Sequence, residues 1–263
     1  MILDLFKLTG KVAIVTAAGR GIGAAIADAF AQAGADVVIG ARTESQLREV
    51  AAGVEAHGRK ASVVAGDLSQ REGMEVLVQR ALDDFGRLDI VVNNAGGSMP
   101  RAFLDTSENA FNRAFQWNVT SAFNLTQLAV PHMLKSGGGS VINIASSAGR
   151  FSDRGFAAYG TAKAALVHLT ANLAADLSPR IRVNAIAPGA IATSALEVVL
   201  QNEALEAEMK RRTPLGRLGV TDDIAAGALY LASPASSYVT GRVLDIDGGL
   251  KGSNLDMGLP DLE

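Results

Sequence analysis

Tyr159 and Lys163 stand four residues apart in a segment with helical spacing, so we expect their side chains on one face of a helix. A free phenol has a pKa near ~10 and is poorly suited to proton transfer at neutral pH. An ammonium group one turn away favours the phenolate and lowers that pKa. The pair therefore predicts a general acid and base, although many isolated Tyr-x-x-x-Lys pairs lie on ordinary helix surfaces.

A second group of residues with chemical potential lies near the N-terminus, where an apolar run, Val12–Thr16, leads into a glycine-rich turn and an alanine-rich helical segment. Glycines at a strand-to-helix turn let the backbone approach a pyrophosphate, and the helix N-terminus supplies free N–H groups and a positive dipole end. A tight turn without a ligand is the alternative for the glycines alone. The strand before them and the helix after them favour binding of a dinucleotide's phosphates by Gly19, Arg20, Gly21, Ile22 and Gly23.

Short β-branched runs alternate with helical patterns along the whole chain. Seven runs are apolar at nearly every position, as expected of strands buried on both faces, and they are Val12–Thr16, Val37–Gly40, Ala61–Ala65, Ile90–Val92, Val141–Ala145, Ile181–Ile186 and Val243–Ile246. Helical segments between them include Ile22–Ala33, Ser45–His57 and Met74–Phe85. This alternation predicts an α/β fold with a doubly wound, seven-stranded parallel sheet and helices on both faces.

No linker or change in composition divides the chain, so we predict one Rossmann-type domain over residues 1–263. One segment departs from the alternation of strands and helices. Ser194–Arg212 is long, polar on one face and flanked by prolines, which predicts a substrate lid over residues 194–212. The last dozen residues, 252–263, are expected to form a C-terminal tail that is loose or crosses to a neighbouring subunit.

The composition excludes several classes of protein. The formal charge is 24 − 27 = −3, with 48% hydrophobic and 19% charged residues, which excludes a disordered chain. The mild acidity argues against a nucleic-acid or membrane surface as partner. There is no cysteine, and His57, His132 and His168 are far apart, so no metal site is predicted. Asp4 and Lys7 interrupt any apolar leader, and we expect a cytoplasmic protein.

These motifs together resemble the short-chain dehydrogenase/reductase family, over roughly Leu8 to Leu250. The family carries Thr-Gly-x-x-x-Gly-x-Gly at the glycine turn, and this chain has Ala17 in place of the first of those glycines. The further family marks follow in the right order, and they are Asp67-Leu68, Asn93-Asn94-Ala95-Gly96, Pro188-Gly189-Ala-Ile191-Ala-Thr193 and Asp247-Gly248-Gly249. Each alone could be an ordinary turn or cap.

The resemblance implies roles for most of these residues. Asp67 and Leu68 would contact the adenine ring, and Asn94, Ala95 and Gly96 would line the cofactor groove. Pro188, Gly189, Ile191 and Thr193 would form the turn at the nicotinamide.

The choice of cofactor follows from the end of the second expected strand. NAD-selective sites place an acid there to accept from the ribose 2′-hydroxyl, but this chain has Ala41 followed by Arg42. Arg42 and Arg20 would attract a 2′-phosphate, because the guanidinium fork suits phosphate. The alternative is that both are solvated surface arginines, and Glu44 lies close by. We predict preference for NADP(H), with NAD(H) possible.

The resemblance also implies the catalytic residues. Ser146 lies thirteen residues before Tyr159, as the family's catalytic serine does, and Ser147 is a competing choice. Asn118 matches an asparagine that opens a helix and holds a water against the lysine. Tyr159 would be acid in reduction and base in oxidation, and Lys163 would also hold the nicotinamide ribose. The implied reaction is hydride transfer between NADP(H) and a ketone/secondary alcohol pair.

The substrate is the least determined property. The expected pocket walls, Gly97–Met99, Arg150–Phe156 and Ile191–Leu200, are mostly small or apolar, which favours an apolar, hydroxysteroid-like small molecule. A 3-oxoacyl thioester on acyl-carrier protein or coenzyme A is the alternative, with Lys135 and Arg180 as the candidate contacts to an acidic carrier.

Two further hypotheses are that the protein is a non-catalytic dinucleotide-binding regulator, or that it is an epimerase or dehydratase. Retention of Ser146, Tyr159 and Lys163 disfavours the first, and the short chain disfavours the second. The family resemblance and the Ala/Leu faces of Asn109–Leu134 and Tyr159–Leu177 predict a homotetramer.

Overall fold

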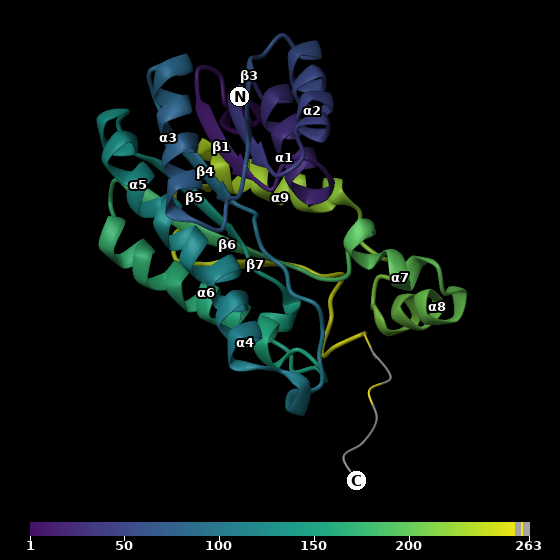
Figure 1. The fold of residues 1–263 in the computed structure, drawn as a ribbon. Helices are drawn as coiled ribbons and strands as arrows, with labels where there is room; N and C mark the ends of the chain where they lie inside the picture. The colour runs from purple at the N-terminus through teal and green to yellow at the C-terminus, as the bar shows by residue number, and fades with distance from the viewer. Residues whose placement is uncertain (256–258, 260–263) are drawn as a thin grey trace.

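The computed structural model describes residues 1–255 and 259. Its centre is a seven-stranded sheet of order β3-β2-β1-β4-β5-β6-β7, in which every neighbouring pair is parallel (Figure 1). The strands are β1 (Val12–Thr16), β2 (Asp36–Ala41), β3 (Ala61–Ala65), β4 (Ile90–Asn93), β5 (Gly139–Ile144), β6 (Ile181–Pro188) and β7 (Val243–Ile246). The predicted doubly wound parallel sheet is confirmed.

Helices cover both faces of the sheet. The helices are α1 (Gly21–Gln32), α2 (Glu44–Ala56), α3 (Arg71–Phe85), α4 (Glu108–Phe115), α5 (Ser121–Lys135), α6 (Ala157–Leu177), α7 (Glu197–Leu200), α8 (Glu203–Arg212) and α9 (Thr221–Ala232). One core cluster joins α1, α2 and α9 to the sheet, and a second joins α3, α5 and α6 to its other face. The short helices α7 and α8 stand to one side of these layers (Figure 1).

Burial of the strands follows their place in the sheet. The five strands from β2 to β6 in spatial order are buried at nearly every position, whereas β3 and β7 lie at the two edges and are largely half-exposed. The expectation that all seven strands are buried on both faces is therefore wrong for these two. An edge strand has a neighbour on one side only, so less of its surface is covered.

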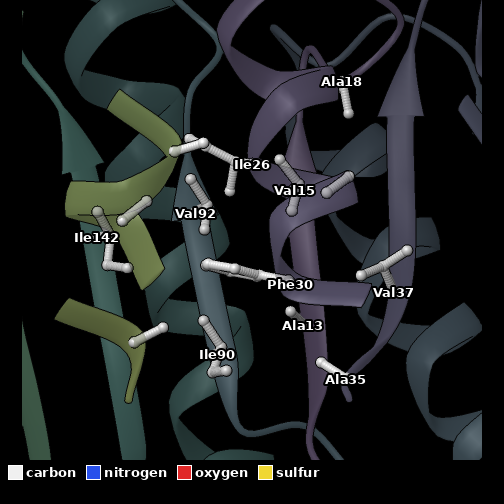
Figure 2. Packing of buried hydrophobic residues seen from close by; sticks show 14 of the residues in the cluster. Ala13, Val15, Ala18, Ile26, Phe30, Ala35, Val37, Ile90, Val92 and Ile142 are labelled. Atoms are coloured by element: carbon white, nitrogen blue, oxygen red, sulfur yellow. The ribbon is translucent and has the colours of Figure 1, made fainter. Parts of the chain in front are cut away.

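The core fixes α1 against the sheet. Ile26 and Phe30 are fully buried and point from α1 toward Val15 and Val92 of the adjacent strands β1 and β4 (Figure 2). Burial of a side chain of this size contributes roughly 1.5–3 kcal/mol. The glycine turn between β1 and α1 is consequently held between two rigid elements.

The strand order changes direction between β1 and β4, since β1 pairs with β2 on one side and with β4 on the other. The connections that follow these two strands leave the sheet in opposite directions. A crevice forms at this point, beyond the carboxyl ends of the strands, where α/β folds bind their ligands.

The helix expected over Asn109–Leu134 is interrupted. A π-helical turn, Gln116–Thr120, separates α4 from α5. Inside the turn, the Nδ2 of buried Asn118 donates to the carbonyl oxygen of Ala114 at 2.9 Å. A side chain that takes a backbone carbonyl in this way loosens the regular hydrogen-bond ladder, and such π turns are frequent at functional sites.

The expected lid and the end of the chain pack against each other. Met209 of α8 and Leu218 are buried, with Leu196 and Leu255 against them. Asn254 is also buried, and its Nδ2 donates to Thr213 Oγ1 at 2.9 Å. The rest of the expected tail, 256–258 and 260–263, lies outside the described residues. Within the described part of the chain, none of the helices combines the length and the apolar character needed to cross a lipid bilayer.

Candidate active site

A cavity of about 610 Å³ runs along the carboxyl edge of the sheet, from the glycine turn to Tyr159. It brings together most of the predicted site residues. Those that line it are Gly19, Arg20, Gly21, Ile22, Arg42, Leu68, Asn94, Gly96, Ser146, Tyr159, Lys163, Pro188, Gly189, Ile191 and Thr193. Residues separated by more than 170 positions in the chain thus share one wall.

The glycine turn suits a pyrophosphate. The N-cap of α1, Arg20, makes no side-chain capping bond, so no side chain there occupies the first N–H groups of the helix. Gly21 has a φ of 59°. A Cβ atom on Gly23 would lie 2.6 Å from the carbonyl oxygen of Ala17, so only glycine allows this approach of helix and strand. The turn therefore fits the phosphates of a dinucleotide cofactor.

Ala17 adopts a backbone conformation that usually belongs to glycine. Its φ is +50°, and it is the one non-glycine residue with a positive φ in the part of the chain that the structure describes. A left-handed conformation costs an L-residue roughly 1–2 kcal/mol. The family's glycine at this position would carry no such cost, so this chain stores strain at the mouth of the cofactor site.

Asn94 ties the glycine turn to β4. Its Nδ2 donates to the carbonyl oxygens of Thr16 at 3.0 Å and Ala17 at 3.2 Å. The backbone N–H groups of Asn94 and Ala95 both donate to Thr16 Oγ1 at 2.9 Å. These bonds hold the two loops at the switch point in one arrangement.

Arg20 and Arg42 are exposed, and both line the cavity at its outer end. Asp67 is exposed and lines a neighbouring cavity with Arg42, and its Oδ1 accepts from the N–H of Ser69 at 2.9 Å. That hydrogen bond, and to a smaller extent the Arg42 charge, lowers the pKa of Asp67. Leu68 beside it is fully buried beneath the groove.

Ser146 and Tyr159 form a hydrogen-bonded pair in the inner part of the cavity. Ser146 is the N-cap of a short 3₁₀ turn, Ser147–Gly149, and its Oγ accepts from the N–H of Ala148 at 3.2 Å. The serine side chain is therefore oriented by backbone that immediately follows β5. Ser147, the competing choice, is part of the turn itself.

Lys163 is 3% exposed, and its Nζ donates to the carbonyl oxygen of Ile144 at 2.7 Å. The Nζ lies 5.8 Å from the centre of the Tyr159 ring. Burial lowers the pKa of Lys163 to about 7. The ammonium and the phenol thus share one end of the cavity, as their spacing in the sequence predicted.

The expected lowering of the Tyr159 pKa by Lys163 is not found. Burial raises the pKa of Tyr159 above its ordinary value, and the hydrogen bond with Ser146 offsets only part of that rise. The reason is that the low-dielectric wall disfavours the phenolate, and the lysine beside it is itself destabilised as a cation by the same burial. The phenol is consequently held protonated at neutral pH.

Asn118 lies behind the cavity wall rather than in it. Its Oδ1 accepts from the N–H of Gly97 at 2.9 Å, and its Nδ2 donates to the Gly97 carbonyl oxygen at 3.1 Å. A Cβ atom on Gly96 would lie 2.7 Å from both Asn118 Oδ1 and Lys163 Nζ. Only a glycine at position 96 leaves these two polar atoms room near each other.

Three other predicted residues do not line this cavity. Gly23 and Ala95 act through the close approaches and backbone bonds described above, and Asp67 faces the adjoining space. Sequence reasoning missed several residues that do line it, among them Gln46, Gly66 and Trp117. Trp117 carried a signal, because it directly precedes Asn118 in the interrupted helix.

Comparison with known proteins places the chain in a family. A family profile described as enoyl-(acyl carrier protein) reductase matches residues 16–251. An uncharacterized oxidoreductase of Mycobacterium tuberculosis is 59% identical over 263 residues, covering 100% of both chains. The 7alpha-hydroxysteroid dehydrogenase of Escherichia coli K12 is 42% identical, covering 94% of this chain and 96% of that protein. A 3-oxoacyl-[acyl-carrier-protein] reductase of Chlamydia pneumoniae is 38% identical, covering 92% and 98%.

Solved structures agree. A 7 alpha-hydroxysteroid dehydrogenase complexed with NADH and 7-oxo glycochenodeoxycholic acid superposes with a TM-score of 0.91 at 42% identity, covering 96% of this chain and 98% of that one. A gluconate 5-dehydrogenase of Burkholderia cenocepacia in complex with NADP and tartrate has a TM-score of 0.89 at 32% identity, covering 95% and 98%. With these likenesses over nearly its full length, the chain belongs to the short-chain dehydrogenase/reductase family and is an oxidoreductase of that family.

Proposed function

We propose that the protein interconverts a ketone and a secondary alcohol with NADP(H) as cofactor, acting on an apolar, hydroxysteroid-like substrate. The observation that carries the proposal is the hydrogen-bonded pair of Ser146 and Tyr159 in the same cavity as the glycine turn. A substrate oxygen at this pair lies within one continuous space with a dinucleotide on the turn. The relatives named as hydroxysteroid dehydrogenases support the substrate class.

Tyr159 is the acid and base of the proposed reaction. In reduction its phenol donates a proton to the ketone oxygen, and in oxidation it takes the proton of the alcohol. Burial favours the neutral phenol, which is the form needed for reduction. Ser146 holds the substrate oxygen beside the phenol, and orientation of this kind supplies a large part of catalysis.

The cofactor would lie along the remaining residues of the cavity. A bound nicotinamide dinucleotide supplies or accepts the hydride. Gly19–Gly23 would hold its pyrophosphate, Leu68 and Asp67 would flank the adenine, and Pro188–Thr193 would flank the nicotinamide. Lys163 would hold the ribose, and Asn118 would continue the proton path behind Gly96.

Preference for NADP(H) is the finer part of the proposal. Arg20 and Arg42 supply two guanidinium groups where an NAD site has an acid, and β2 ends at Ala41. We expect tighter binding of NADPH than of NADH, measured by calorimetric titration of each, and loss of the difference in Arg42→Ala. Equal affinities in the unchanged protein, or tighter NADH, contradict the preference.

A 3-oxoacyl thioester is the second candidate substrate, supported by the named reductase relative and the family profile. The experiment compares initial rates of NADPH oxidation with a bulky steroid ketone and a short 3-oxoacyl thioester. Faster steroid reduction supports the apolar pocket, and faster thioester reduction makes exposed Lys135 and Arg180 the next residues to test. Absence of turnover with every carbonyl substrate would favour the hypothesis of a non-catalytic dinucleotide-binding regulator.

A further inference from the structure

A second cavity, of about 580 Å³, adjoins the cofactor cavity. It lies between α4, the loop after β4 and the loop after β3, and it extends to Gly155 and Ala158 near the start of α6. Three residues line both cavities, namely Arg42, Gly97 and Trp117. The two cavities therefore share part of their walls.

The second cavity is rich in positive charge. Arg42, Arg101 and Arg113 line it, and Asp67 is the one carboxylate among the described residues that do so. All three arginines are exposed, and within the described chain no carboxylate lies at ion-pair distance from any of them. Asp67 already accepts a hydrogen bond from Ser69. The cavity thus has an excess of unpaired guanidinium groups.

Some arginines elsewhere in the described chain are paired with carboxylates. Arg87 makes two bonds to Asp89, at 2.8 and 2.6 Å, and Arg217 makes two to Asp223, at 2.7 and 3.0 Å. Both of these arginines are held in place by a carboxylate of the fold. Arg101 and Arg113 come from different elements, face one cavity and have no such partner.

The remaining lining offers an apolar surface. Met99, Ala110, Ala114 and Trp117 line the second cavity together with the arginines, and Trp117 also lines the cavity of the catalytic pair. We propose that this cavity binds the anionic end of an elongated, otherwise apolar substrate, with Arg101 and Arg113 as the residues that contact the anion. This inference rests on the proposed function, because it places the substrate carbonyl at Ser146 and Tyr159.

Either a carboxylate or a phosphate could bind these arginines, because a guanidinium group donates two parallel hydrogen bonds to either anion. The carboxylate would come from the side chain of a steroid acid. The phosphate would come from the coenzyme A portion of an acyl thioester. Arg42 is left to the cofactor, so the substitutions that test the inference are confined to Arg101 and Arg113.

Binding is tested first, without turnover. Trp117 is the protein's only tryptophan and lines both cavities, so its fluorescence reports occupancy. With NADP⁺ saturating, the protein is titrated with a 7-oxo steroid acid, its methyl ester and free coenzyme A. Arg101→Gln with Arg113→Gln should weaken binding of at least one anionic ligand about tenfold and leave the ester unchanged. Arg80→Gln on α3, whose arginine pairs with Asp84 at 3.8 Å, is the matched control and should change nothing.

Kinetics then identify the source of the anion. The KM of the double variant is compared for the steroid acid against its ester, and for a 3-oxoacyl-coenzyme A against the same acyl group on N-acetylcysteamine. If the KM rises only for the steroid acid, the anion bound by the two arginines is a carboxylate. If the KM rises only for the coenzyme A thioester, the anion is a phosphate. Equal effects on charged and neutral members, or no effect on either, overturn the inference. If no ketone is reduced while charge-selective binding persists, the proposed function fails and the anion site stands.

Discussion

The phenol of Tyr159 is half-buried, and burial and its bond with Ser146 shift its pKa in opposite directions. The upward shift is the larger, so the phenol stays protonated at neutral pH, as the proposed proton donor must be. Lys163 beside it has a pKa of about 7, so near neutral pH both its charged and its neutral forms are populated.

Replacement of Tyr159 by Phe removes the proposed proton donor and keeps the ring. We expect turnover to fall by about 10²–10⁴-fold, the usual contribution of a positioned general acid. NADPH affinity should stay within about twofold, because the other cofactor contacts are intact. Initial rates and a calorimetric titration measure the two effects. Tyr230→Phe on α9 is the control, and turnover of the Tyr159 variant close to that of the control would refute the assignment.

Ala17 carries backbone strain that a glycine would not. Ala17→Gly should raise the free energy of unfolding by about 0.5–1 kcal/mol, since relief of the left-handed conformation exceeds the entropy added to the unfolded chain. Urea unfolding measures the change. Ala52→Gly, at an exposed position inside α2, should lower stability by about 1 kcal/mol instead. A lower midpoint for Ala17→Gly would show that the strain is absent in solution.

At the scale of elements, the two walls of the proposed substrate site are joined by the end of the chain. We call Ser253–Leu255 the C-terminal strap. Ser253 Oγ donates to the carboxylate of Asp153, in the loop between Ser146 and Tyr159. Asn254 bonds the end of α8 through Thr213, and Leu255 packs in the cluster of Met209. The strap thus links the proposed lid, 194–212, to the loop between Ser146 and Tyr159.

Loss of this link should loosen the lid. Asn254→Ala removes the hydrogen bond that Thr213 Oγ1 accepts from Asn254. We expect the substrate KM to rise about tenfold while the Kd for NADPH is unchanged, because only the substrate wall is released. Steady-state kinetics and calorimetry separate the two constants. Asn112→Ala, at an exposed position of α4, serves as control. An unchanged KM would mean that the strap has no part in forming the site.

At the scale of the whole molecule, a charge network lies at the amino ends of β1 and β4, opposite the carboxyl ends that form the site. Asp89 has a side chain only 3% exposed, and it accepts from Lys11, Arg87 and the N–H of Val12. Burial raises its pKa, but the bonds from Arg87, Lys11 and Val12 together outweigh that and hold the pKa below the ordinary 3.8. Because the folded-state pKa is depressed, the carboxylate stabilises the fold above pH ~4, and this contribution is lost as the pH falls.

Urea unfolding at a series of pH values tests the network. Between about pH 5 and pH 3 the unchanged protein should lose more stability than Asp89→Asn, whose side chain does not titrate. The variant should be the less stable of the two at neutral pH, because an amide oxygen accepts weaker hydrogen bonds from Lys11, Arg87 and the N–H of Val12 than the carboxylate does. Asp105→Asn, at an exposed position, should show the same pH dependence of stability as the unchanged protein. Parallel pH curves for all three would exclude Asp89 as the cause.

Assembly belongs to the same scale. Phe111, Phe123 and Leu134 on α4 and α5 are 36%, 41% and 42% exposed, which leaves apolar side chains along the helices proposed to form a homotetramer. We expect sedimentation at micromolar concentration to show a tetramer, and Phe123→Glu to shift it toward smaller species. Phe103→Glu, on a 3₁₀ turn outside these helices, should leave it intact. A monomer of unchanged protein refutes the prediction, and the cytoplasmic location stays a prediction beside it.

The sequence alone determined the fold class and the family. Strand runs such as Val12–Thr16 and the i, i+4 pair of Tyr159 and Lys163 are local, and local spacing follows directly from helix and strand geometry. Glycines that must approach other atoms closely, such as Gly23, are also visible in a sequence once a strand and a helix flank them. The parallel sheet followed from such patterns, and most of the cavity-lining residues followed from the family resemblance.

Only the tertiary structure decided what depends on burial and on distant neighbours. The raised pKa of Tyr159, the half-exposed strands β3 and β7, and the π turn at Asn118 each arise from what packs around the residue. The same holds for the cavity that unites Arg42, Arg101 and Arg113 from three separate segments. Spacing along the chain does not predict such contacts, because dielectric surroundings and charge pairing depend on which distant residues pack together in the folded chain.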